Sequence, residues 1–267
     1  MTTTDLEERT RPSLIETAQT RSVSFENAAA MVRRIVAVRH VKPSLVSELA
    51  CEIGAEIIEG IRAPGEDLNT VDLSNQYRTS RTPIREALML LEKEGLVDIP
   101  PRRRPRVMKA ELAEVRDIYH ARSALLGLVV SRVAVVVEPA QLDELDQIVE
   151  AMHAAAEAAD VSTYLWANTE FHEKNNNIAS NLVVTRILDS LLLRSLPFRK
   201  LSLSRPQGME RSCRDHLYLM QAYRDHDPVL AAAIMRSNVA NALARLETVI
   251  TDSQTVSIKS RGRRAKS

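Results

Sequence analysis

The sequence contains little of what stabilises disulfide-rich or strand-rich proteins. Its 267 residues include two cysteines, Cys51 and Cys213, which lie far apart in segments with helical patterning. We therefore expect no disulfide framework. We expect both cysteines to be buried free thiols in a reducing cytosol. Seven glycines and 3% aromatic residues leave little material for tight turns and alternating strands. A hydrophobic content of 45% still allows a substantial core, so we expect a mainly helical protein.

Long apolar runs and a secretory leader are also missing. No uninterrupted run of about 18 apolar residues occurs, because the most apolar segment, 125–137, contains Ser131 and Arg132. The N-terminal run MTTTDLEERT is polar and carries acids, unlike a signal peptide. We therefore expect a cytoplasmic protein with no membrane partner. Because the net charge is only +1, a site for a polyanion has to come from local clustering of charge.

Such a cluster lies between residues 70 and 108. Its first part fits two helices joined by a tight connection over 78–80. The second helix is expected to follow an N-cap at Ser80, whose hydroxyl satisfies a free amide. It is expected to end before Gly95, which adopts positive φ without strain. Pro83 fits the first turn of this helix, where its missing N–H does no harm.

The faces of the second helix separate apolar from basic side chains. The apolar ones recur at the spacing of one buried face, at Ile84, Leu88 and Leu91. Arg81 and Arg85 are four residues apart and share another face. Arginine can donate two hydrogen bonds to the O6 and N7 of guanine in the major groove. The helix therefore predicts a DNA-reading element, with the hydroxyls of Ser80 and Thr82 suited to phosphate oxygens.

After this helix the sequence predicts a short hairpin. Residues 96–99 and 106–108 fit two strands, and the turn between them carries three consecutive arginines. Such a tip suits phosphates or a minor groove. Exposed helices and loops often carry arginines, but this combination in this order predicts double-stranded DNA as a partner. The residues expected at the interface are Arg78, Thr79, Ser80, Arg81, Thr82, Pro83, Arg85, Arg102, Arg103 and Arg104.

The run SRTPIREALMLLEKEGLV, followed by the arginine-rich hairpin, resembles the winged helix-turn-helix of GntR-family bacterial transcription regulators. A helix over 44–61 and the turn after it agree, so the resemblance covers residues 44–108. It implies base or phosphate contacts from Arg81 and Arg85 and a phosphate-binding wing. Two positions depart from the family pattern. Arg78 stands where glycine is usual, and Arg104 stands where the wing tip usually has a small residue.

The remainder divides into an N-terminal extension and a helical domain. Residues 1–22 lack periodicity, whereas 24–39 fit a helix that either adds an arm for DNA or rests on a neighbouring domain. We interpret this helix in the second way. The predicted domains are a partly helical extension (1–42), a winged helix-turn-helix (43–110), an all-α effector-binding and dimerisation domain (111–252) and a basic disordered tail (253–267).

Helical periodicity continues through the second domain, which predicts a bundle of six or seven helices. Pro197 is expected to kink or split the fourth of these. The fold class is therefore mainly α, with a small β-hairpin wing in the first domain. A bundle of this kind can enclose a small-molecule site between facing helices.

Short segments at 170–172, 215–217 and 235–238 resemble the FCD domain, the C-terminal ligand domain of the FadR-like branch of the GntR family. The resemblance spans residues 112–250. It implies a small carboxylate effector, which in many members binds beside a divalent metal held by one aspartate and three histidines.

Mapped onto this chain, that ligand set is altered. Asn168 stands where the aspartate is expected, His172 and His216 are kept, and Asn238 stands where the third histidine is expected. Neutral amides are poor ligands for zinc or nickel. We therefore expect no metal, or a weak site at His172 and His216. The four side chains either bind the effector directly or satisfy one another's hydrogen bonds.

An arginine can bind a carboxylate through two hydrogen bonds. Arg122 is the first candidate in the bundle, followed by Arg194 or Arg186, although each could instead form a surface ion pair. The complete expected effector site is Tyr119, Arg122, Asn168, His172, Arg194, His216 and Asn238.

These features predict a homodimeric, ligand-responsive transcription regulator, in which two winged helices meet a two-fold operator about one helical turn apart. Release of repression by the effector is the expected mode of control. One alternative is a dimeric DNA-binding protein that senses no effector. A metal-dependent enzyme using His172 and His216 is the other, and the absence of a recognisable nucleophile, base or phosphate loop argues against it.

Overall fold

The computed structural model describes residues 22–39, 44–109, 111–205 and 207–264, and the side chains of these residues apart from 37–39 and 252–264. The described part forms ten helices and a two-stranded antiparallel sheet. The elements are α1 Val23–Arg39, α2 Leu45–Ile58, α3 Thr70–Gln76, α4 Arg81–Lys93, β1 Val97–Asp98, β2 Arg106–Val107, α5 Leu112–Val136, α6 Pro139–Glu157, α7 Val161–Ala179, α8 Leu182–Leu203, α9 Gly208–Arg224 and α10 Pro228–Arg264.

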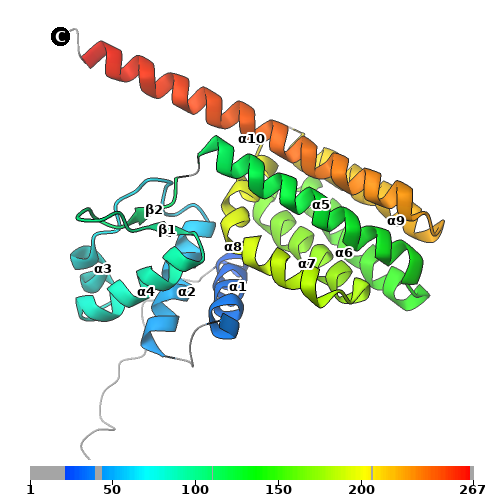
Figure 1. The fold of residues 1–267 in the computed structure, drawn as a ribbon, viewed down its shortest axis with the longest axis horizontal. Helices are drawn as coiled ribbons and strands as arrows, with labels where there is room; N and C mark the ends of the chain where they lie inside the picture. Colours follow the sequence, from blue (N-terminus) through cyan, green and yellow to red (C-terminus); the bar gives the residue numbers. More distant parts are fainter. Residues whose placement is uncertain (1–21, 40–43, 110, 206, 265–267) are drawn as a thin grey trace, which may run out of the picture.

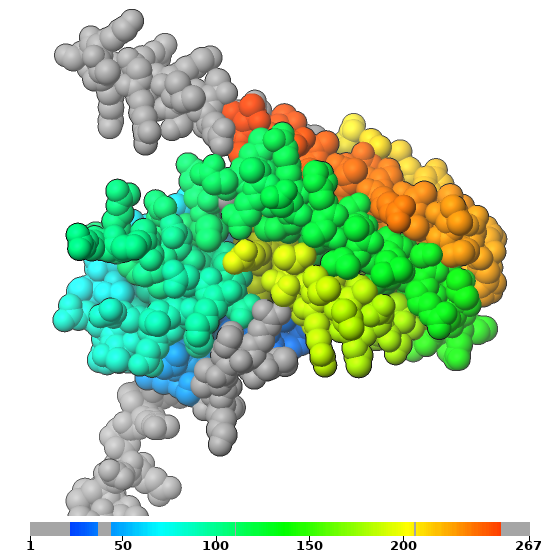
Figure 2. Space-filling view, in the orientation of Figure 1, coloured from blue at the N-terminus to red at the C-terminus, as the bar shows by residue number. Residues whose placement is uncertain are grey.

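Two bodies lie side by side, as Figure 1 shows. One contains α2, α3, α4 and the sheet, and the other is the bundle of α5 to α10. Helix α1 packs mainly on α2 and also touches α7 and α8. This helix thus rests on both neighbouring bodies, which agrees with its interpretation as an extension helix. The prediction for residues 1–22 lies outside the described residues except for Ser22. In Figure 2 the α8 surface meets the smaller body at the boundary between the two.

The helix-turn-helix forms where the sequence predicts it. α4 begins after Ser80 and ends at Lys93, and Gly95 follows with a φ of 75°. The apolar face is fully buried at Ile84, Leu88 and Leu91. The expectation that the Ser80 hydroxyl caps this helix is wrong. A cap accepts from the second or third helical amide, and the third position here is Pro83, which has no N–H.

A short antiparallel ladder pairs Val97 with Val107 and Asp98 with Arg106. The Arg106 guanidinium donates to Asp98 Oδ2 across this ladder, at 2.6 and 2.8 Å. β2 is also bridged on its other side by Asp67, which follows the turn after α2. The ladder thereby attaches the hairpin to the helices of the smaller body.

Helix α5 packs along α10 and also contacts α7, α8 and α9, which makes it the central helix of the bundle. By length and composition it is apolar enough to cross a membrane, although half of its most apolar stretch is buried inside the bundle. The core helix of a soluble protein commonly passes the same test.

Two boundaries differ from the sequence predictions. α8 continues through Pro197 without splitting, so the described bundle has six helices. α10 extends to Arg264, so the disordered tail predicted from residue 253 is wrong as far as 264. No proline interrupts residues 252–264, and their one glycine lies close to the helix end.

Candidate nucleic-acid interface and buried arginine cavity

The face of α4 that points away from the core is basic and open. Arg81, Thr82 and Arg85 are exposed on it, as is Ser80 just before the helix. Neither arginine forms an ion pair with any residue that the structure describes. Two uncompensated guanidiniums on the first two turns of a helix are available to base edges or phosphates.

The connection between α3 and α4 is a strained turn. Arg78 has a φ of 49°, a left-handed conformation that a non-glycine residue adopts only at some cost. The Thr79 amide donates to Ser74 O at 2.9 Å and holds the turn closed. Arg78 is exposed and Thr79 is half-buried. The structure thus explains why glycine is usual at this place, and here the same backbone presents a further cation beside α4.

The wing ends in a tight turn over residues 100–103, closed by the Arg103 amide donating to Pro100 O at 3.2 Å. Arg102 occupies the left-handed position of this turn with a φ of 60°. The turn position that would favour a small side chain is therefore occupied by Arg102. The resemblance to the GntR family predicts Arg104 at this position. All three wing arginines are exposed and without ion pairs among the described residues.

A second basic site is buried in the bundle. We call it the arginine cavity, a hollow of about 40 Å³ with no acidic residue in its lining. Its lining comes from α5, α7, α8, α9 and α10, and consists of Tyr119, Arg122, Asn168, His172, Arg199, Ser202, Leu203, Ser212, Asn238, Val239, Ala242 and Arg245. Five of the seven predicted effector residues are among them.

Hydrogen bonds determine the orientation of two of the predicted residues. Arg199 donates to Asn168 Oδ1 at 2.6 Å, so the Asn168 amide nitrogen faces His216 Nε2 at 3.2 Å. Arginine only donates and an amide nitrogen only donates, so His216 Nε2 has to accept. His216 Nδ1 then carries the proton and donates to Ser212 O at 2.6 Å. His216 lies behind Asn168 and supports it, and does not line the cavity.

Other polar groups of the cavity lack partners. Arg122 forms no hydrogen bond or ion pair with the described residues. The Tyr119 hydroxyl and His172 Nδ1 are buried atoms without a hydrogen-bond partner. An unsatisfied buried polar group costs about 1–3 kcal/mol. These groups converge on one space, so a ligand rich in acceptor atoms would satisfy several of them together.

The electrostatics of the cavity favour an anion. Burial and the charge of Arg122 lower the pKa of Arg199 to about 9, and burial lowers the pKa of Arg122. Both guanidiniums are still charged at neutral pH. Burial, followed by Arg199 and Arg122, holds the pKa of His172 well below its ordinary value, so this imidazole is neutral. The lining of the cavity therefore carries positive charge and no carboxylate, although Glu173, on the other side of Arg199, offsets part of the charge of that guanidinium.

The side chains present do not fit a divalent metal. The lone pair of His216 Nε2 is taken by the Asn168 amide, and the Asn168 oxygen is taken by the Arg199 guanidinium. The Asn238 amide nitrogen is 3.0 Å from Asp215 Oδ2, which it serves as a donor. Among the described residues, no group of three or more His, Cys, Asp or Glu side chains could hold a metal ion. The Arg199 guanidinium thus lies beside Asn168, His172 and His216, where the FCD resemblance implies a metal.

Of the predicted effector residues, Arg194 is not brought to the arginine cavity. This residue lies over Gly95 at the boundary between the two bodies and approaches Glu114 at 3.5 Å. Arg186 is exposed on α8. Sequence reasoning missed Arg199 and Arg245 instead. Arg199 belongs to a polar stripe with Ser195 and Ser202 at helical spacing, while the other buried residues of α8 are apolar, and this stripe is the signal that could have found it.

Comparisons with known families match the two sites. The family described as "Bacterial regulatory proteins, gntR family" matches residues 45–107, which contain α4 and the wing. The FCD domain matches residues 117–241, which contain every residue of the cavity lining except Ala242 and Arg245.

Similar proteins carry regulatory names. The chain is 27% identical over 172 residues to the HTH-type transcriptional repressor RspR of Escherichia coli, covering 64% of this chain and 75% of the relative. It is 24% identical over 206 residues to the gluconate operon transcriptional repressor of Bacillus licheniformis, covering 74% and 84%. Escherichia coli McbR/YncC has a similar fold, with a TM-score of 0.65 at 20% identity, over 78% of this chain and 100% of that one.

Proposed function

This chain belongs to the GntR family of bacterial transcription regulators and carries an FCD domain, and on that premise we propose that a small organic anion in the arginine cavity controls its affinity for an operator. The chain is a DNA-binding regulator and not an enzyme. Its named relatives include repressors, which supports repression as the mode of control. The observation that carries the proposal is a buried set of arginines with no acid in the cavity lining.

The DNA interface is proposed to combine the basic face of α4 with the wing. Exposure and the lack of ion pairs among the described residues support Arg81 and Arg85 for base contacts and residues 102–104 for phosphate contacts. Thr79 and Pro83 are half-buried and are assigned to shaping the turn and the start of α4. Arg78, Ser80 and Thr82 flank the base-reading face and suit the DNA backbone.

The effector is proposed to be a carboxylate or a similar anion. A carboxylate accepts two hydrogen bonds from one guanidinium, and Arg122 and Arg199 both have donors to spare. Tyr119, His172 and Asn238 line the same space and would contribute orientation. Ligand sites for drug-sized molecules usually measure about 300–1,000 Å³, whereas this one is about 40 Å³. Entry of anything larger than a small head group therefore requires the helices to separate.

A homodimer is proposed, because one winged helix covers half of a two-fold operator. The bundle offers an apolar surface for it. Leu128 and Val135 on α5 are exposed, as are Leu182, Val183 and Ile187 on α8. Leu128, Leu182 and Val183 border one depression of about 570 Å³. Sedimentation velocity of Val183→Glu would show loss of the dimer if this surface forms it, and an unchanged dimer would exclude the surface.

A cytoplasmic location is also proposed. The relatives are bacterial transcription regulators, a class that generally acts on DNA in the cytoplasm. DNA binding is proposed for residues 43–110 and effector binding for the helices from residue 111. The GntR match over 45–107 and the FCD match over 117–241 support these two ranges.

The test is a gel shift on DNA from the region upstream of the protein's own gene, with and without acetate, lactate, malonate, succinate and citrate. A specific shift that one acid alters supports the proposal, and Arg122→Met should remove the effect of the acid. Arg186→Met, an exposed arginine on α8, is the matched control. A specific shift that no acid alters, together with no thermal stabilisation by any acid, would favour a dimeric DNA-binding protein that senses no effector.

A further inference from the structure

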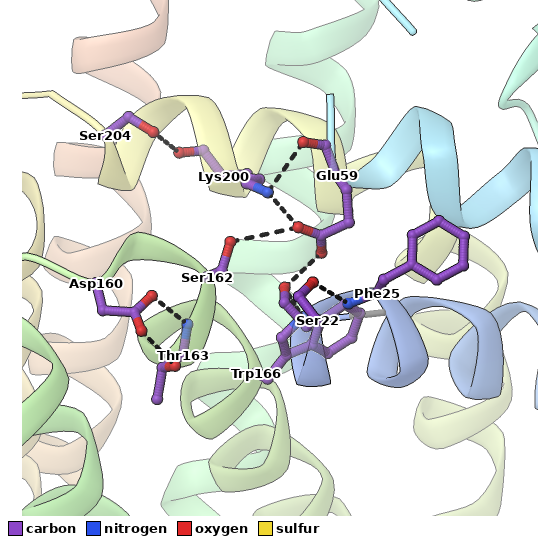
Figure 3. A network of polar contacts seen from close by, with 10 residues as sticks. Ser22, Phe25, Glu59, Asp160, Ser162, Thr163, Trp166, Lys200 and Ser204 are labelled. Atoms are coloured by element: carbon purple, nitrogen blue, oxygen red, sulfur yellow. Dashed lines mark hydrogen bonds and ion pairs between the residues drawn. The ribbon is translucent and has the colours of Figure 1, made fainter. Parts of the chain in front are cut away.

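One carboxylate, at the end of α2, lies at the junction of the two bodies of the molecule. Glu59 is the C-cap of α2, and its side chain is only 9% exposed. It accepts hydrogen bonds from Ser24 Oγ of α1 at 2.7 Å and from Ser162 Oγ of α7 at 3.3 Å. Figure 3 shows Glu59 reaching between these helices toward Lys200. Three helices outside its own domain therefore meet at this carboxylate.

Lys200 of α8 binds Glu59 in two ways. Its Nζ donates to Glu59 Oε2 at 2.5 Å and to the Glu59 main-chain O at 3.1 Å. The second bond satisfies a carbonyl at the C-terminus of α2, where a cation is also favoured by the helix dipole. We call this pair of contacts the Glu59–Lys200 latch. It attaches α8 directly to the helix that packs against α4.

The latch is adjacent along the chain to the arginine cavity. Lys200 follows Arg199, which lines the cavity and binds Asn168. On α7, Asn168 is preceded two residues earlier by Trp166, whose indole Nε1 donates to Ser24 Oγ at 3.0 Å. Both partners of the Arg199–Asn168 bond are thus near neighbours of residues that hold the junction.

The surroundings of the latch leave room for α8 to move. An apolar hollow of about 260 Å³ lies between α8 and the smaller body, bordered by Leu96, Met108, Phe198 and Leu201. Pro197 borders it too and lacks the N–H that would complete the helical hydrogen bonds at this turn. The cavity on the other face of α8 is too small for most ligands without widening.

We propose that filling the arginine cavity displaces the Arg199–Lys200 turn of α8 and thereby loosens the Glu59–Lys200 latch, which frees the winged-helix body to change its position. The inference rests on the proposed function, because it assigns the route by which the cavity would control DNA binding. An anion that competes for Arg199 would remove a donor from Asn168 and shift the turn that carries Lys200. The two-state element is the latch, closed as observed or open.

The decisive experiment needs no ligand. Hydrogen–deuterium exchange of the segment 57–62 and the emission of Trp166, the one tryptophan of the chain, report on the junction. In the full chain, Arg199→Met should raise exchange in this segment and shift the emission. Arg186→Met, on the same helix but exposed, should change neither. Arg199→Gln, which removes the charge and shortens the side chain, serves as the second variant if Arg199→Met does not fold. Wild-type exchange and emission in a folded Arg199 variant would overturn the proposal.

A second experiment distinguishes the role of the Glu59–Lys200 latch from binding of the acid in the arginine cavity. Lys200→Met should keep thermal stabilisation by whichever acid of the panel binds. Without acid, its operator affinity should already equal that of the acid-bound wild type, because the latch is open in this variant. The effect of that acid on operator affinity, typically about 5- to 150-fold for allosteric effectors, should fall toward onefold. A full effect of the acid in Lys200→Met would also overturn the proposal. If no acid binds the wild type, the proposed function fails, whereas the ligand-free comparison still decides the latch.

Discussion

The two groups of arginines in this protein have opposite surroundings. Those on α4 and the wing are exposed and lack ion pairs among the described residues, so water compensates their charge. Arg122 and Arg199 are buried, at 5% and 7% exposure, and their cavity has no acidic residue in its lining. Burial makes the second group dependent on a partner, because an unbalanced charge in a protein interior is costly.

One residue type thus serves two kinds of anion in this protein. Exposed guanidiniums on rigid elements suit a long polyanion, where many weak, salt-sensitive contacts add together. Buried guanidiniums suit a small anion, because low dielectric strengthens each contact and the enclosing walls limit size. The carboxylates Glu173 and Asp189 lie on the other side of Arg199 and contact Arg34 of α1, at 2.7 and 3.8 Å. Glu173 also offsets part of the charge of Arg199.

The largest effect is expected at the exposed group. Arg81→Ala or Arg85→Ala should weaken specific operator binding by about 1–3 kcal/mol each, the usual value of a bidentate base contact. Fluorescence anisotropy with operator and scrambled duplexes measures this loss. Arg186→Met is the control for a general change of charge. Unchanged operator affinity in both alanine variants would exclude this face of α4 from base reading.

The next effect tests the buried group. An acid of the panel that occupies the cavity at 100 times its Kd should raise the free energy of unfolding by about 2.7 kcal/mol. Urea unfolding with and without the acid measures this stabilisation. Arg122→Met should strongly reduce it, because Arg122 is the cavity guanidinium that has no hydrogen bond or ion pair with the described residues, whereas Arg81→Ala should leave it intact. Stabilisation that persists in Arg122→Met would place the acid elsewhere.

A smaller effect is expected from the wing. Replacing residues 102–104 with alanine should reduce the slope of log K against log salt by about 0.9 for each phosphate contact that is lost. Binding to scrambled DNA should weaken in parallel, because phosphate contacts carry no sequence information. Salt titrations by anisotropy give both slopes. An unaltered slope would show that the wing does not touch phosphates.

The smallest effect concerns pH. The pKa of His172 is held well below 6.5 by burial and by the cavity arginines, so the unfolded chain binds more protons as the pH falls below about 6.5. Stability from this group is complete above that pH and declines below it. His172→Gln should reduce the slope of unfolding free energy against pH by up to about 1.4 kcal/mol per unit. Urea unfolding between pH 7.5 and 5.5 measures it, with exposed His120→Gln as the control. If His172→Gln has the same slope of unfolding free energy against pH as the wild type, His172 is not the group whose lowered pKa causes the slope.

Much of the fold was predictable because local rules determine it. The spacing of Ile84, Leu88 and Leu91 specified the buried face of α4, and Gly95 specified its end. Arg122 could be expected in the cavity because it lies near the place where the FCD family often carries an arginine, and it does line the cavity. The wrong assignment of the Ser80 cap shows the limit of such rules, since its amide partner was missing at Pro83.

The helices, the helix-turn-helix and the exposed basic face of α4 follow from the sequence alone, because they depend on periodicity and on side-chain chemistry within one segment. The five predicted residues that line the cavity were expected mainly from the resemblance to the FCD domain. Only the tertiary structure decided that Arg199 faces the cavity while Arg194 lies over Gly95 and Lys200 binds Glu59. These three residues are close together on α8. The rotation of α8 about its axis determines which of the three residues faces the cavity, Gly95 or Glu59. Packing of α8 against the bundle and against the smaller body sets this rotation.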